Sequence, residues 1–267
     1  MEKFRAIDSH CHIYPDSIVH KAVKSIEEFY DNHYHAFDGT VTTMLKNGEA
    51  AGIEAYVIFS VATSPHQVSS INHFISDAVS ASDGKFFGLG TLHPDSENVC
   101  EDFAELLSLG LRGVKLHPDI QKIAVDDERY KRIYRLCSGK CPVLIHLGDC
   151  RYDFSGPERF RNILEEFPEC IFIGAHFGGW SVWEKATEML SSYPNLYVDT
   201  SSSLADIPTE TATALIEKYT ADRVIFGTDY PLGDSKKEVE LLRKAVTNES
   251  DLKKIMSENA SKLFGIS

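Results

Sequence analysis

Several features that mark whole classes of protein are missing from this chain of 267 residues. Its six cysteines include no Cys-x-x-Cys pair and are too sparse for a disulfide scaffold, so we expect reduced thiols. No stretch approaches the roughly 20 apolar residues of a membrane span, and the N-terminus lacks the apolar segment of a signal peptide. The sequence therefore predicts a cytoplasmic protein without a membrane partner.

Basic residues are scarce relative to acidic ones. The 27 Lys and Arg residues stand against 40 Asp and Glu residues, which gives a formal net charge of −13. Nucleic-acid binding needs an excess of cations to neutralise phosphates, so the balance argues against a nucleic-acid partner. The sequence leaves open whether the chain forms a homo-oligomer.

Motifs for nucleotide binding and for serine nucleophiles are absent as well. The chain contains no Gly-x-Gly-x-x-Gly, no Gly-x-x-x-x-Gly-Lys-[Ser/Thr] and no Gly-x-Ser-x-Gly. These absences argue against a dinucleotide cofactor, against nucleoside triphosphate hydrolysis and against serine hydrolase chemistry.

The sequence does contain a regular series of short apolar runs, each followed by a polar cluster. Eight runs occur in order, at 4–9, 53–60, 86–91, 111–116, 142–147, 171–175, 196–200 and 223–228. Several are apolar at consecutive positions, which is typical of strands buried on both faces of a parallel sheet. Helical periodicity predicts helices at 41–51, 66–82, 128–138, 157–167, 181–192, 209–219, 235–247 and 250–264.

Eight strand–helix units in series without a long linker favour an α/β fold of one type, the (β/α)8 TIM barrel. We expect a single domain over residues 1–267, and an open doubly wound sheet is the alternative. The interval after the first run holds an insertion at 14–39 that is rich in aromatic and histidine residues. Long loops in compact domains are often lids, so this insertion is either a lid or a segment packed on the barrel without touching substrate.

Polar side chains follow four of the runs at the ends that meet on one rim of such a barrel, the face where these enzymes work. His10 and His12 follow the first run and point the same way, because they are two residues apart on a strand. His146 lies at the end of the fifth run, and His176 and Asp229 follow the sixth and eighth runs. Imidazole and carboxylate groups suit divalent metals, so the rim is predicted to hold a metal site.

The order and spacing of these motifs resemble the amidohydrolase superfamily, and within it the "amidohydrolase 2" group of hydrolases and non-oxidative decarboxylases. The resemblance covers the whole chain and rests on DSHCH at 8–12, GTLHP at 90–94, GVKLHP at 113–118, IH at 145–146, AHFGG at 175–179, FGTDYP at 226–231 and ENASKLFG at 258–265.

The resemblance implies a ligand set of His10, His12, His146 and Asp229 around one divalent ion. Zinc is the first expectation, and manganese, nickel, iron and cobalt are alternatives. Asp229 would also accept the proton of a metal-activated water, and His176 would stabilise or position the reacting group.

Lys115 ends the fourth run and has three interpretations. It could be a carbamylated bridge to a second metal, an ammonium that holds a substrate carboxylate, or a partner in an ion pair at the rim. The one-metal interpretation with a free Lys115 is the prediction. Arg151 and Trp180, in the loops after the fifth and sixth runs, are further candidates for substrate binding.

The predicted function is hydrolysis of a C–N or C–O bond in a small-molecule substrate, such as an amide, lactone or ester, by a metal-activated water. The alternative on the same scaffold is a metal-dependent, non-oxidative decarboxylase of an aromatic or unsaturated acid. A non-catalytic binding protein of the same fold is a third hypothesis. A cationic Lys115 would favour an anionic substrate whether the protein is a hydrolase or a decarboxylase.

Overall fold

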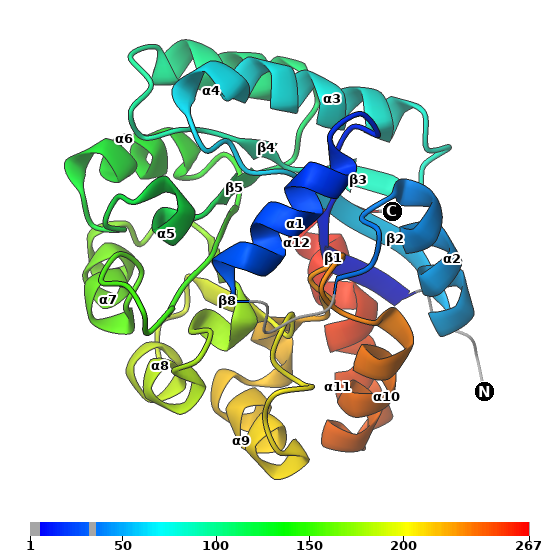
Figure 1. Cartoon of the computed structure of the whole chain (residues 1–267). Helices are drawn as coiled ribbons and strands as arrows, with labels where there is room; N and C mark the ends of the chain where they lie inside the picture. The colour runs from blue at the N-terminus through cyan, green and yellow to red at the C-terminus, as the bar shows by residue number, and fades with distance from the viewer. Residues whose placement is uncertain (1–5, 32–35, 267) are drawn as a thin grey trace.

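The computed structural model describes residues 6–31 and 36–266, and the remainder of the 14–39 insertion, 32–35, lies outside them. The described residues form a ring of parallel strands surrounded by helices (Figure 1). This is the predicted (β/α)8 barrel. The strands are β1 (Ala6–His12), β2 (Ile53–Phe59), β3 (Phe86–Gly88) with its continuation β4 (Gly90–Thr91), β5 (Val114–Leu116), β6 (Val143–Ile145), β7 (Phe172–Gly174), β8 (Leu196–Asp199) and β9 (Val224–Ile225).

Hydrogen bonds between neighbouring strands close the ring. The third barrel strand changes partner at Leu89, whose N–H donates to Ile58, while the next residue, Gly90, donates to Gly113. This change of partner explains why one strand is divided into β3 and β4. Ser9 N donates to Phe226 O at 2.9 Å and joins β1 to the end of β9.

Helices follow the strands along the chain, and most of them form the outer layer. Their bounds are α2 (Val41–Ala51), α3 (Val68–Ser80), α4 (Val99–Ser108), α5 (Pro118–Gln121), α6 (Glu128–Cys137), α7 (Pro157–Glu166), α8 (Trp183–Leu190), α9 (Thr209–Tyr219), α10 (Ser235–Ala245), α11 (Glu249–Lys253) and α12 (Asn259–Phe264). The predicted helices are present, but α4 was not predicted, although Val99, Phe103 and Leu106 follow helical spacing and are buried. The predicted helix 250–264 is interrupted by a π-helical turn, Lys254–Glu258.

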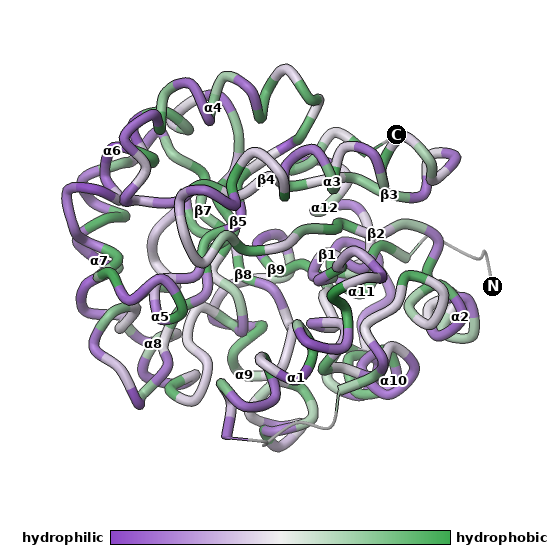
Figure 2. Tube along the Cα trace, turned by 45° about the horizontal axis from the view of Figure 1, so that its top comes forward, coloured by the Kyte–Doolittle hydropathy of each residue, from purple (hydrophilic) through white to green (hydrophobic). Residues whose placement is uncertain are grey.

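Consecutive apolar residues in the strands serve two separate cores. Alternate residues point into the barrel, where Ile7, Val57 and Leu144 form one cluster with Phe264 of α12. The residues between them face the surrounding helices, and Figure 2 shows the hydrophobic colour concentrated on the strands. The continuous apolarity of the runs is thus explained by burial on both faces.

Helix α1 (Val19–Phe29) belongs to the insertion and crosses the barrel mouth (Figure 1). Val19 and Val23 are its buried residues, whereas Lys24 and Glu28 are exposed. Within the described residues, no helix combines the length and apolarity needed to cross a bilayer.

Candidate active site

A cavity of about 640 Å³ lies at the rim where the strands end, a volume ordinary for a small-molecule site. Six of the predicted site residues line it: His10, His12, Lys115, His146, His176 and Asp229. Helix α1 contributes Lys21, Ser25, Ile26 and Phe29, and α3 contributes Ser70, Ile71 and Phe74. The insertion therefore forms a wall of the same cavity as the polar cluster.

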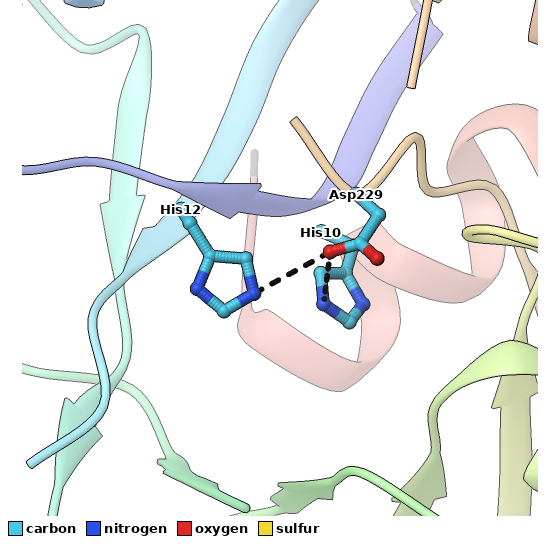
Figure 3. A group of neighbouring side chains, drawn as sticks. All are labelled: His10, His12 and Asp229. Atoms are coloured by element: carbon cyan, nitrogen blue, oxygen red, sulfur yellow. Dashed lines mark ion pairs between the residues drawn. The ribbon is translucent and has the colours of Figure 1, made fainter. Parts of the chain in front are cut away.

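His10, His12 and Asp229 come together where β1 meets the segment after β9 (Figure 3). Asp229 Oδ1 lies 3.3 Å from His10 Nε2 and 3.4 Å from His12 Nε2. Asp229 N donates to His10 O at 2.9 Å, and a Cβ at Gly227 would lie only 2.8 Å from the Cβ of His10. Asp229 adopts a φ of +66°, which non-glycine residues rarely do and which the surrounding structure must enforce. Three ligand-type atoms are thereby held around one point.

The protonation states of this triad suit a metal ion. Burial lowers the pKa of His10 to about 4, and the nearby Lys115 adds to the effect. Burial also lowers the pKa of His12. Burial raises the pKa of Asp229, but the adjacent His10 and His12 outweigh it and hold the pKa well below its usual value. Neutral imidazoles and an ionised carboxylate are the metal-binding forms, so the donor set fits a divalent cation.

Asp199, which the sequence analysis missed, orients His10. It ends β8 with 0% exposure, and its Oδ2 accepts a hydrogen bond from His10 Nδ1 at 2.7 Å. With its proton on Nδ1, His10 presents the bare Nε2 to Asp229, the arrangement that fixes the tautomer of metal-binding histidines. Asp8 accepts from the backbone of His10 and from Thr228 instead of from an imidazole. A carboxylate near the end of the seventh run, at 196–200, was the available signal for Asp199.

His146 stands beside the triad in this structure and pairs with His176. Its Nδ1 lies 3.0 Å from His176 Nε2. Because His176 Nδ1 donates to Ser201 O at 2.9 Å, the proton between the two rings belongs to His146 Nδ1. The His146 Nε2 atom is buried and has no hydrogen-bond partner among the described residues. The His10 and His176 ring centroids are 5.4 Å apart, so the pair and the triad are neighbours.

His117, Asp119 and His146 form a second group of metal-ligand type, but its ring geometry is unfavourable. The rings of His117 and His146 stack with their centroids 3.9 Å apart and their planes 8° apart. A ligating imidazole holds its metal in the ring plane, and one ion cannot lie in two parallel planes separated by this distance. His117 Nδ1 also accepts from Ile120 N at 3.3 Å. We therefore assign no metal to this group.

Lys115 lies at the centre of the cluster. It is 1% exposed, and its Nζ is 3.2 Å from His10 Nε2, the atom that also faces Asp229. Burial lowers the pKa of Lys115 to about 8, against the opposing effect of Asp199 and Asp229. In the described part of the chain no carboxylate forms an ion pair with Nζ within 4.0 Å. A metal on His10 would compete with this hydrogen bond, so Nζ must then take another partner.

Arg151 and Trp180 lie behind Tyr30 and do not line the main cavity. Arg151 pairs with Asp149 through two hydrogen bonds of 2.9 and 2.7 Å. Trp180 is 9% exposed and packs edge-on against Tyr30 with ring centroids 5.0 Å apart. Of the three predicted substrate-binding residues, the structure thus places Lys115 in the polar cluster and Arg151 and Trp180 one layer away from it.

Comparison with known proteins agrees with this arrangement. A family model described as Amidohydrolase matches residues 7–266. The chain belongs to this amidohydrolase family. No curated protein sequence matches it.

Solved structures are similar over nearly the whole chain. An uncharacterized TIM-barrel protein, Bb4693 from Bordetella bronchiseptica, is 22% identical with a TM-score of 0.81, and the match covers 98% of this chain and 99% of that one. The 5-carboxyvanillate decarboxylase LigW from Sphingomonas paucimobilis is 14% identical with a TM-score of 0.74, over 98% and 99%. A dihydroxybenzoic acid decarboxylase from Polaromonas sp. JS666, with bound manganese and the inhibitor 2-nitroresorcinol, is 15% identical with a TM-score of 0.73, over 98% and 97%. At these identities the likeness establishes the barrel fold.

Proposed function

We propose that this amidohydrolase-family protein is a metal-dependent, non-oxidative decarboxylase of an aromatic carboxylic acid. The observation that carries the proposal is the cavity, which joins a His/Asp cluster to apolar walls. Ile26 and Phe29 of α1 and Phe74 of α3 offer surfaces for a flat ring. Decarboxylases of aromatic acids among the similar structures give further support. This proposal reverses the order of the two activities that the sequence favoured.

Charge around the cavity is consistent with an anionic substrate. The whole chain carries a formal net charge of −13, yet the described residues that line the cavity include two lysines, Lys21 and Lys115, and a single carboxylate, Asp229. Asp229 faces His10 and His12, so its charge would be neutralised by a bound cation. An approaching carboxylate would therefore meet a locally favourable field within an acidic protein.

His10, His12 and Asp229 would hold the divalent ion, and His146 is the candidate fourth ligand, provided that it turns away from His176. A metal bound there supplies a Lewis acid that orients and polarises the substrate oxygens. Oxygen and imidazole donors accept both manganese and zinc, and the manganese in the Polaromonas structure makes manganese the first ion to test.

The reaction balances with one proton taken up from solvent and passed to the ring carbon by a side chain of the cavity wall. The bond between the ring carbon and its carboxylate breaks, carbon dioxide leaves, and the ring carbon keeps the electron pair and takes up one proton. Asp229 and His176 are the groups on the cavity wall that would carry this proton. Lys115 would donate hydrogen bonds to the substrate once its Nζ leaves His10.

The test is a paired screen of the purified protein loaded with manganese or zinc. Hydroxylated benzoic acids are followed by chromatography of the decarboxylated phenol and by release of carbon dioxide. Lactones and amides are followed by release of acid. Decarboxylation that is lost in His12→Ala would support the proposal. Turnover confined to lactones or amides would overturn it and restore the hydrolase hypothesis.

A further inference from the structure

Arg151, in the loop after β6, reaches across to the end of α1. Its Nη1 donates to Phe29 O and to Asp31 Oδ2, both at 2.7 Å. Its Nε and Nη2 donate to the two carboxylate oxygens of Asp149, in its own loop, at 2.9 and 2.7 Å. Phe29 is the last residue of α1, and the loop that carries Arg151 begins directly after the strand end that bears His146. A single guanidinium thus joins a wall of the cavity to the barrel rim.

The two sides of this contact differ in strength. Asp149 is 2% exposed, and it also accepts a hydrogen bond from Arg151 N at 3.0 Å. Two parallel hydrogen bonds to one carboxylate fix the plane of a guanidinium. The side chain of Asp31, in contrast, is 79% exposed, so water can replace it as a partner. The guanidinium therefore stays with its own loop, and the contact that can open is the one with α1.

The end of α1 uses this cation because the helix provides none of its own there. The last C=O groups of a helix lack partners within it, and a positive charge offsets their partial negative charge. The last turn of α1 contains no basic residue, so Arg151 supplies the charge from the loop. The buried residues of α1, Val19 and Val23, lie in its first half. The apolar anchors of α1 are thus near its beginning, and Arg151 is the charged anchor at its end.

Aromatic rings from both segments surround the guanidinium. Arg151 Cζ lies 5.1 Å from the ring centroid of Phe29 and 5.5 Å from that of Tyr30, at the end of α1. It lies 5.3 Å from the centroids of Tyr152 and Trp180, in the loops after β6 and β7. Phe29 and Tyr30 line the main cavity, whereas Arg151 lines a second depression outside it. The cation–π contacts therefore act on the rings that close the cavity on this side.

We propose that Arg151 is a positioning residue that latches the end of α1 over the cavity, and that a bound ligand leaves when this latch opens. In the open form α1 is detached from the guanidinium, and Arg151 remains paired with Asp149. Arg151 then contributes to substrate binding through Phe29, without touching the substrate. The inference rests on the proposed function only in taking aromatic anions as ligands of the cavity. It makes α1 a lid and assigns the residue that holds it closed.

The first measurement follows α1 without any ligand. Hydrogen–deuterium exchange of peptides from α1 is compared in the parent protein, in Arg151→Met and in a control, Arg159→Met. Arg159 of α7 is matched because its guanidinium also binds two carboxylates, Asp126 and Asp153, but lines neither space. Loss of hydrogen bonds to a charged group predicts roughly 10- to 100-fold faster exchange near the end of α1. Exchange of α1 should be unchanged in Arg159→Met.

The second measurement follows release of 2-nitroresorcinol from the manganese-loaded protein by stopped-flow absorbance. Arg151→Met should raise koff by a similar factor, because release passes through the open form, while metal content stays at the parent value. Arg151→Lys keeps a charge beside Asp149, but its ammonium lacks the planar set of donors that binds both segments. It should show the same two changes at smaller size, and it decides the matter if Arg151→Met does not fold.

The outcomes separate the latch from the proposed function. Unchanged exchange of α1 in the folded Arg151 variants overturns the latch. Faster exchange with an unchanged koff overturns the claim that release passes through an open α1. Equal effects in Arg159→Met overturn the assignment to Arg151. Failure of the loaded parent protein to bind 2-nitroresorcinol overturns the proposed function and the claim about release, and the exchange of α1 then decides the latch alone.

Discussion

Replacement of Asp199 by Asn should weaken metal binding without removing any ligand. Asp199 Oδ2 accepts from His10 Nδ1 at 2.7 Å, and Oδ1 accepts from His176 N at 2.9 Å and from Ser201 N at 3.1 Å. An amide at position 199 must turn its NH2 group toward one of these donors. If it faces His10, the imidazole proton moves to Nε2 and blocks the atom that faces the metal site.

The size of the effect follows from the kind of contact. Loss of an outer carboxylate that orients a metal-binding histidine typically costs 10- to 100-fold in metal affinity, or about 1.4–2.8 kcal/mol. Both side chains are essentially buried, so solvent cannot replace the lost hydrogen bond. We therefore expect Asp199→Asn to weaken the manganese or zinc Kd by this factor.

The assay is titration of the metal-free protein in competition with a chromophoric chelator, with thermal melting to confirm folding. Asp8→Asn is the matched control. Asp8 is a carboxylate of the same barrel that is 1% exposed and accepts from Thr228, but it does not touch an imidazole. Its metal Kd should change less than about threefold. A folded Asp199→Asn protein with the parent metal Kd would refute the reasoning.

Three further predictions address other parts of the chain. Asp229→Asn should lower kcat about 10²- to 10⁴-fold if Asp229 carries the proton, and near-full turnover in a metal-loaded variant would exclude that role. Lys115→Ala should keep its metal and raise KM for an anionic substrate; loss of one metal equivalent that a short carboxylic acid restores would instead indicate a carbamylated bridge. Burial raises the pKa of Glu238 to about 8, so this acid is neutral when folded but charged when unfolded, and stability falls as the pH rises from about 4.5 to 8. Glu238→Gln should therefore stabilise the protein by roughly 2–4 kcal/mol more at pH 8 than at pH 5 in denaturant titrations, whereas Glu240→Gln, on the exposed face of α10, should not.

The helical segment near the C-terminus contains a feature that the local sequence pattern does not predict. Its periodicity predicted one continuous helix at 250–264, but the structure has a π-helical turn, Lys254–Glu258, between α11 and α12. Within this turn, Ile255 O accepts a hydrogen bond at 2.9 Å from the N–H of Phe226, the residue that follows β9. A π turn shifts carbonyl groups out of the regular helical pattern, so a tertiary partner can use one of them. Nothing in the local sequence encodes that partner.

The sequence by itself determined the barrel and the residues available at its rim. Strands buried on both faces require consecutive apolar residues, and polar residues that follow such runs in a parallel barrel must gather at one edge. These constraints act within a few residues, so they are readable without a structure. They were sufficient to bring His10, His12 and Asp229 to the same point.

The tertiary structure alone decided how those groups are paired. Asp199 meets His10 from 189 residues away, Lys115 meets it from 105, and Tyr30 meets His117 from 87. Such contacts depend on strand register, on side-chain rotamers and on the path of α1 across the barrel mouth. A shift of a few ångströms in any of these would break a hydrogen bond while leaving the hydrophobic pattern intact. The hydrophobic pattern of the sequence therefore specifies the barrel, whereas the long-range contacts specify which side-chain atoms at its rim can react.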